Sequence, residues 1–347
     1  MEEQKTTIRL LFVGSPLLDI SGDCDDGVLC RFKLKEDDCV RAGPEHEPLF
    51  QRLFVSDVSR MAAGGSAQNA ARVAKWTLGP RGEVAFAGCA GDDTFEAWMR
   101  ENLQTEGVHP IYFRIPGEKT GVCACLLSPG GKRSMCTRHG AAAKFSVRHL
   151  HDPNFKTWLD KADCVSVVGY FLVHSPEAVA ELAELCRPEQ VFSLSLSAEY
   201  VCRSSSKALL RVLPRVDVLF GNEAEVKACA VVASGACHDV TVTEALQILR
   251  QLPRLPNCPP RIVVVTQGSK PLLLDDGSDD IKTLDVAKNV TVADGVGCGD
   301  ALCGAFLTAY IRDGRDAESA AKEGIRAATR ILQVHGCDTT AAGAVKD

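Results

Sequence analysis

Beyond Phe145 the chain alternates short apolar runs with helical stretches, and this alternation constrains the fold more than any other feature. Strands are predicted near 164–169, 191–196, 216–220 and 261–266, with helical spacing between them. Two further strands, near 271–274 and 281–285, have the pattern of a hairpin. Because each parallel pair needs a crossover of helix length, this order predicts an α/β fold, a doubly wound and mostly parallel sheet flanked by helices.

The first 140 residues are less regular. We predict a strand at 8–14, a mixed segment to about Met61, a helix from Ser66 and a second strand at 83–88. Three short strands follow at 111–115, 121–127 and 133–138, and turn signals between them predict a meander. Residues 1–347 then form one α/β domain, with a small β-sheet lid built from about 20–60 and 115–140.

Charge and composition exclude several classes of protein. The formal net charge of −6 lacks the basic excess of a protein that binds nucleic acid along its phosphates. No apolar run approaches the roughly 18 residues of a membrane span, and the acidic start does not resemble a signal peptide. We therefore expect a cytoplasmic monomer that binds neither membranes nor nucleic acid. The sixteen cysteines are expected to be reduced thiols.

The most informative motif is a glycine-rich turn that leads into an apolar helix, from Asp294 to Gly304. Its glycines leave backbone N–H groups uncovered at a helix N-terminus, where the helix dipole also favours an anion. Asp300, in the first turn, would repel a resting phosphate, so it is better explained as a base that takes a proton from an attacking hydroxyl. The alternative is an acid that only stabilises the helix terminus.

A second motif, Gly64-Gly65-Ser66-x-x-Asn69, brings bare backbone and an amide to the start of a helix. Such a surface suits a sugar, since Asn69 can donate and accept hydrogen bonds, although Ser66 could simply cap the helix. Asp19 follows the first strand, where ligands bind in open α/β sheets, and its carboxylate could accept bonds from two sugar hydroxyls. An isolated aspartate there is more often a turn residue.

Taken together, these motifs resemble those of the ribokinase, or PfkB, family of sugar and nucleoside kinases, and most closely its adenosine kinases. The resemblance runs along essentially the whole chain. In order, it rests on Pro16-Leu17-Leu18-Asp19, Gly64-Gly65-Ser66-x-x-Asn69, Gly91-Asp92-Asp93, Thr120-Gly121-Val122-Cys123-Ala124, Lys132-Arg133-Ser134, Leu196-Ser197-Ala198, Asn222-Glu223-x-Glu225 and Gly297-x-Gly299-Asp300.

The resemblance implies an enzyme of purine salvage that uses ATP to phosphorylate the 5′-hydroxyl of adenosine, giving AMP. Asp300 would be the general base, and the N–H groups of Gly297, Cys298 and Gly299 the anion hole. Arg133 matches an arginine that family members swing toward the transferred phosphate. The substrate-binding residues would be Asp19, Gly64, Gly65, Ser66 and Asn69 for the ribose and Tyr170 for the adenine.

The same resemblance implies where ATP and Mg²⁺ bind. Asn222 and Glu225 match a family motif that orders magnesium through water, although their spacing also suits a helix cap. Thr266, Gly268 and Asp294 would belong to the ATP site.

Some positions depart from the family pattern. Ser15 and Ser195 stand where adenosine kinases usually have asparagine, and Gly295 and Val296 replace residues that contact the nucleotide phosphates. Two other readings therefore stay open. The chain could be another PfkB-family sugar or nucleoside kinase, or a diverged nucleoside-binding protein with little catalysis.

Overall fold

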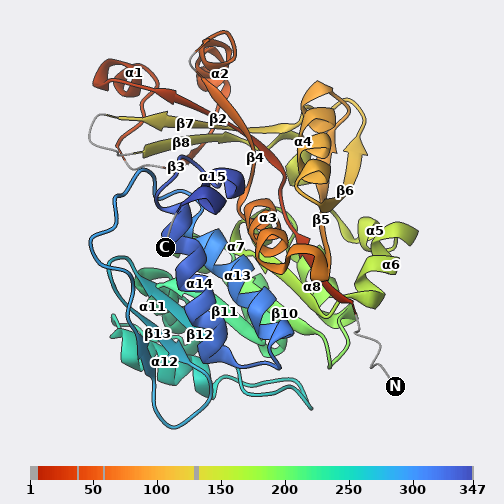
Figure 1. The fold of residues 1–347 in the computed structure, drawn as a ribbon, viewed down its shortest axis with the longest axis vertical. Coiled ribbons are helices and arrows are strands. Elements are labelled where there is room, and N and C mark those ends of the chain that lie inside the picture. Colours follow the sequence, from red (N-terminus) through yellow and green to blue (C-terminus); the bar gives the residue numbers. More distant parts are fainter. Residues whose placement is uncertain (1–6, 37–38, 58, 129–132, 346–347) are drawn as a thin grey trace.

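The computed structural model describes residues 7–36, 39–57, 59–128 and 133–345, which fold into two sheets with helices around the larger one (Figure 1). Within this part of the chain, the larger sheet has nine strands in the order β14-β13-β12-β11-β10-β9-β1-β5-β6. Its strands are β1 (Ile8–Val13), β5 (Gly82–Gly91), β6 (Val108–Ile115), β9 (Cys164–Val168), β10 (Val191–Ser195), β11 (Val218–Asn222), β12 (Ile262–Gln267), β13 (Lys270–Asp275) and β14 (Lys282–Leu284).

The strands from β12 to β6 are all parallel, and β13 and β14 add an antiparallel hairpin at one edge. β9 is buried along its whole length, as expected where helices cover both faces of a parallel sheet. The predicted α/β fold, with a mostly parallel sheet flanked by helices and a second smaller sheet, is confirmed.

Helices account for most of the remaining chain. They are α1 (Asp26–Arg31), α2 (Glu47–Phe54), α3 (Ser66–Leu78), α4 (Thr94–Thr105), α5 (Val147–Leu150), α6 (Pro153–Lys161), α7 (Gly169–His174), α8 (Pro176–Leu185), α9 (Glu199–Ser204), α10 (Ser206–Val212), α11 (Glu223–Ser234), α12 (Val242–Gln251), α13 (Cys298–Arg312), α14 (Ala317–Ile331) and α15 (Thr339–Ala344). None of the helices in the described ranges is both long and apolar enough to span a membrane.

The smaller sheet lies at one end of the molecule, in the order β3-β8-β7-β2-β4 (Figure 1). Its strands are β2 (Leu17–Asp23), β3 (Cys39–Arg41), β4 (Arg60–Gly64), β7 (Gly121–Leu127) and β8 (Arg133–Arg138). Alternate residues of β2 are buried, the pattern of a strand with one face on the core. This sheet comes from the two stretches predicted to form a lid, and its movement as a lid stays a prediction.

The predicted meander of three strands is wrong. β7 and β8 do form an antiparallel pair, but β6 lies in the larger sheet, parallel to β5. The physical reason is the helical crossover between β5 and β6. α4 carries the chain back to the amino ends of the parallel strands, so β6 pairs with β5 in the larger sheet. The turn at Pro116-Gly117 therefore carries the chain from one sheet to the other.

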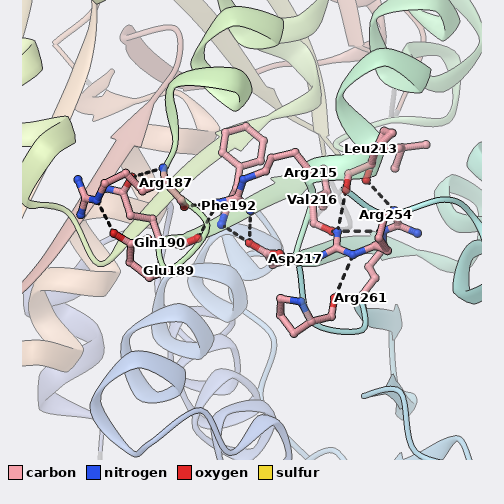
Figure 2. A network of polar contacts seen from close by, with 12 residues as sticks. Arg187, Glu189, Gln190, Phe192, Leu213, Arg215, Val216, Asp217, Arg254 and Arg261 are labelled. Atoms are coloured by element: carbon pink, nitrogen blue, oxygen red, sulfur yellow. Dashed lines mark hydrogen bonds and ion pairs between the residues drawn. The ribbon is translucent and has the colours of Figure 1, made fainter. Parts of the chain in front are cut away.

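A buried ionic network ties the loops at the edge of the larger sheet where β10 and β11 begin (Figure 2). The carboxylate of Asp217 accepts hydrogen bonds from Arg215 and Arg254, each at 2.5 Å, and from the N–H of Phe192 at 2.8 Å. Arg261, which is also buried, donates to three backbone carbonyls, and burial lowers its pKa to about 10. One carboxylate thus compensates a cluster of enclosed guanidinium groups.

We predict that Asp217→Asn lowers the free energy of unfolding by about 3 kcal/mol, because it leaves buried arginines without a counter-charge. Urea denaturation would measure the loss. The matched control is Glu199→Gln, which removes an exposed ion pair with Arg203 and should change stability little. Equal effects of the two substitutions would show that the network does not stabilise the fold.

Candidate active site

A cavity of about 500 Å³ lies between the two sheets, at the carboxyl ends of the parallel strands. It opens where the strand order reverses, beside β1 and β9, which is the usual ligand site of open α/β sheets. Eleven of the residues expected to bind substrate, nucleotide or metal line it: Asp19, Gly65, Ser66, Asn69, Tyr170, Asn222, Glu225, Thr266, Gly297, Gly299 and Asp300.

Close packing of α3 against α13 brings two distant parts of the chain together at this cavity. A Cβ atom added to Gly304 would lie 2.2 Å from the carbonyl oxygen of Ala70, so only glycine allows the two helices to approach this closely. One turn further along, Thr308 Oγ1 donates to the carbonyl of Ala74 at 3.3 Å. The N-termini of both helices therefore meet at the floor of the cavity.

Asp300 lies at this meeting point and accepts two hydrogen bonds from α3. Ser66 Oγ donates to one carboxylate oxygen at 2.5 Å, and Asn69 Nδ2 donates to the other at 3.0 Å. Protein surrounds the carboxylate except on its cavity side, and this burial raises the pKa of Asp300, while the two hydrogen bonds oppose the rise. The site thus holds an oriented carboxylate with a strengthened affinity for a proton.

The glycine-rich turn before α13 presents uncovered backbone to the cavity. Gly297, the residue that precedes the helix, has a left-handed conformation with φ of +79°, and no side chain caps the helix there. A Cβ at Gly297 would also come within 2.8 Å of Cys337. The first N–H groups of a helix have no partner within it, and the N–H of Cys298 makes a long contact of 3.5 Å with the carbonyl of Gly295, outside the helix. Such a terminus suits an anion, and the anion hole at Gly297, Cys298 and Gly299 stays a prediction.

Asp294 fixes the shape of this turn. Its carboxylate accepts hydrogen bonds from the N–H groups of Val296 and Gly336, both at 2.7 Å, and the residue is buried. Asp294 and Cys298 are not among the described residues that line the cavity. The predicted contact of Asp294 with ATP stays a prediction, and the structure adds a second role, that of holding the glycine-rich turn in place.

Asn222 and Glu225 form a complete capping box at the start of α11. Asn222 Oδ1 accepts from the N–H of Glu225 at 2.9 Å, and Glu225 accepts from the N–H and the amide of Asn222 at 3.0 and 2.7 Å. Burial raises the pKa of Glu225. Thr266 lies nearby at the end of β12 and lines the cavity, whereas Gly268, two residues on, does not.

Asp19 and Tyr170, predicted to contact the ribose and the adenine, line other parts of the cavity wall. Asp19 lies in β2, in the smaller sheet, and a Cβ added to Gly64 would lie 2.0 Å from its carboxylate, so glycine makes room for Asp19. Tyr170, in α7, faces Tyr200 across 6.5 Å between ring centroids, and both line the cavity. Ser15, buried in the lining, has a hydroxyl with no protein partner among the described residues.

The side chain of one predicted site residue, Arg133, is not described by the structure. The backbone of Arg133 begins β8, but its side chain lies outside the described part of the chain, as do residues 129–132 before it. The proposed approach of Arg133 to a phosphate therefore stays a prediction from the sequence.

Several cavity residues were not identified from the sequence. Met135, Thr137 and His139 alternate along β8 and its end, and all three line the cavity. Burial, with the neighbouring His174, lowers the pKa of His139 to about 4, so a neutral imidazole borders the cavity at neutral pH. The period-two spacing within a predicted strand was the available signal, because it places alternate residues on one face.

Comparisons with known proteins agree with this geometry. The model of the pfkB family carbohydrate kinases matches residues 53–342. Adenosine kinase 2 of Arabidopsis thaliana is 30% identical over 332 residues, which are 94% of each chain. The adenosine kinase of Anopheles gambiae, solved with P1,P4-di(adenosine-5) tetraphosphate, is 34% identical with a TM-score of 0.87, covering 95% of this chain and 97% of that one.

A further solved relative carries a bound nucleoside and a bound nucleotide. The adenosine kinase of Schistosoma mansoni, in complex with adenosine and AMP, is 25% identical with a TM-score of 0.86. The match covers 97% of this chain and 98% of that chain. The likeness in fold therefore extends over nearly the whole of both chains.

We predict that Gly304→Ala lowers both the melting temperature of the protein and the rate of any reaction that takes place in the cavity. The new methyl group must push α3 away from α13. Overpacking of this kind costs about 1–3 kcal/mol, which thermal unfolding would detect. The matched control is Gly343→Ala in α15, where an added Cβ would make an ordinary contact of 3.5 Å with Trp76. A Gly304→Ala variant as stable and active as this control would disprove the role of the close approach.

Proposed function

This chain belongs to the pfkB family of carbohydrate kinases, and we propose that it is an adenosine kinase, which transfers the γ-phosphoryl group of ATP to the 5′-hydroxyl of adenosine. The relatives that match over nearly the whole chain are adenosine kinases from plants, fungi and animals. The observation that carries the proposal is the carboxylate of Asp300, held by α3 beside the uncapped N-terminus of α13.

Asp300 is suited to act as the general base. A phosphoryl acceptor must lose its proton as it attacks, and a carboxylate with a raised pKa accepts that proton more readily than an ordinary one. Ser66 and Asn69 hold the two oxygens in a fixed orientation, so the base does not have to reorganise. The proton would move from O5′ of the nucleoside to a carboxylate oxygen of Asp300.

The charge that develops on the transferred group would be met by backbone. The N–H groups of Gly297, Cys298 and Gly299 belong to the glycine-rich turn and to the first turn of α13, and the helix dipole adds to them. No side chain has to move for this stabilisation, which is why preorganised amides are effective in phosphoryl transfer. By the resemblance, Arg133 would add a positive charge to this stabilisation.

The nucleoside would bind with its ribose toward the smaller sheet. Asp19, beside Gly64 and Gly65, offers a carboxylate to the ribose hydroxyls, and Asn69 lies on the same side as Asp300. Tyr170 would stack against the adenine, since an aromatic ring gains most from contact with another flat ring.

ATP and magnesium would occupy the opposite wall. Thr266 lines the cavity and would contact the nucleotide, as would Gly268 and Asp294 by the resemblance alone, and Asn222 with Glu225 would hold Mg²⁺ through water. The residues present fit this ion, because each carboxylate oxygen of Glu225 keeps a lone pair beyond its bond to Asn222, and Mg²⁺ retains most of its water. When bound, the ion neutralises phosphate charge. A cytoplasmic location and a monomeric state remain predictions of the sequence.

We predict that Asp300→Asn binds adenosine but loses several orders of magnitude in turnover, because the amide cannot accept the proton. A coupled assay of ADP release with adenosine, inosine, ribose and fructose 6-phosphate would measure turnover, and calorimetry would measure binding. A preference for a free sugar would replace the substrate and keep the family. Near-normal turnover of the variant would overturn the assignment of Asp300.

The raised pKa of Asp300 also predicts the pH dependence of the reaction. The base must be ionised, so kcat/KM for adenosine should fall as the pH drops through the pKa of Asp300 in the free enzyme, at a higher pH than the ordinary aspartate value of about 3.9. The measurement is kcat/KM for adenosine against pH at saturating ATP, with circular dichroism as the control for folding. A residual rate in Asp300→Asn that keeps the same acidic limb would assign the titration to another group.

A further inference from the structure

Two cysteines and the carboxylate of Asp19 lie together at the ribose end of the cavity. Asp19 and Cys123 are directly paired across β2 and β7, and Cys125 follows two residues along β7. Because side chains two residues apart share one face of a strand, all three point to the same side of the smaller sheet. One ligand atom from each lies within 4.8 Å of the other two.

The separation of the two sulfur atoms matches a metal site. Cys123 Sγ and Cys125 Sγ are 3.8 Å apart. In a tetrahedral zinc site, Zn–S bonds of about 2.3 Å place two sulfur atoms about 3.8 Å from each other. The thiols therefore stand at the spacing that such an ion requires, without movement of the strand.

A disulfide between the same two cysteines fits less well. Two residues apart on one strand, their Cα atoms are separated by roughly 6.7 Å, which is the upper limit for a disulfide. None of the sixteen cysteines, all of which lie in the described part of the chain, is disulfide-bonded. Cys136, on the neighbouring strand β8, pairs with Ala124, which lies between the two cysteines of β7, so its side chain points to the other face of the sheet.

We propose that Asp19, Cys123 and Cys125 form a binding site for a thiophilic divalent cation of the zinc class. Two sulfur ligands favour zinc or cobalt over magnesium, which prefers oxygen. Asp19 and Cys123 line the cavity, so a fourth position is open to water or to another ligand. Thr137 Oγ1 donates to Cys123 Sγ at 3.3 Å and orients this sulfur atom. Each thiol that binds the cation releases a proton.

A cation in this site would compete with adenosine for the cavity, an inference that rests on the proposed function. A cation bound by Asp19 and Cys123 would occupy the part of the cavity where the proposed function places the ribose. The cation therefore competes with adenosine, while Asn222 and Glu225, on the opposite wall, are left to magnesium.

The test is a titration of the reduced full-length protein with Co²⁺, followed by the thiolate-to-cobalt absorption band in the near ultraviolet. We expect one equivalent to bind and Zn²⁺ to displace it. Cys123→Ser and Cys125→Ser should each weaken binding by at least about tenfold, the loss that already follows removal of a side chain that only orients a ligand. Asp19→Asn should weaken binding but keep the thiolate band.

The matched control is Cys237→Ser, which removes an exposed thiol far along the chain and should leave the titration unchanged. Absence of the band in the wild-type protein would overturn the proposal, as would a band that survives both serine substitutions. Because Asp19→Asn changes a partly exposed residue, it keeps the test valid if a serine variant fails to fold.

The competition has its own readout. Adenosine should raise the apparent Kd of Co²⁺ in proportion to its concentration, and calorimetry without cation measures adenosine binding separately. Adenosine that binds without changing the cobalt titration would overturn the competition. Failure to bind adenosine at all would count against the proposed function, while the absorption band would still decide the metal site.

Discussion

The close approach of α3 to α13 is the constraint on which the rest of the site depends. Gly304 lets the carbonyl of Ala70 lie where any other side chain would begin. This contact sets the relative position of two helix N-termini that are more than two hundred residues apart in the sequence. One helix supplies the donors that hold Asp300, and the other supplies Asp300 and the glycine-rich turn beside it. Without this packing, the carboxylate of Asp300 and the donors that orient it would not share a cavity.

The site combines two features that oppose each other in isolation. A helix N-terminus attracts anions, but a carboxylate in its first turn adds a negative charge where a phosphate should lie. The structure resolves this conflict by enclosing Asp300, because burial raises its affinity for a proton. A carboxylate that takes up the proton of the attacking hydroxyl loses its repulsion for the phosphoryl group at the moment of transfer. Charge and proton movement are thus coupled through one residue.

The sequence predicted a mostly parallel sheet covered by helices and a glycine-rich turn at the start of a helix, because periodicity and local glycine patterns are properties of short segments. It did not predict that β6 pairs with β5 in the larger sheet, because strand pairing depends on tertiary packing and not on local sequence. The short helix α15 was missed, because its two turns contain mainly small residues. The bond from Ser66 to Asp300 joins residues 234 positions apart, and no local pattern records such a contact. Asn222 and Glu225 show the remaining ambiguity, since one motif serves a helix cap and a water-held metal equally well.

The central claim is that the cavity moves a phosphoryl group from ATP to the 5′-oxygen of a nucleoside. The most direct measurement incubates the purified protein with γ-labelled ATP and magnesium, and compares adenosine with 5′-deoxyadenosine, which has the same base and lacks only the acceptor oxygen. The account predicts that label appears in AMP with adenosine and that no labelled nucleotide forms with 5′-deoxyadenosine. Binding of both nucleosides without transfer to either would contradict it and would leave a nucleoside-binding protein on a kinase fold.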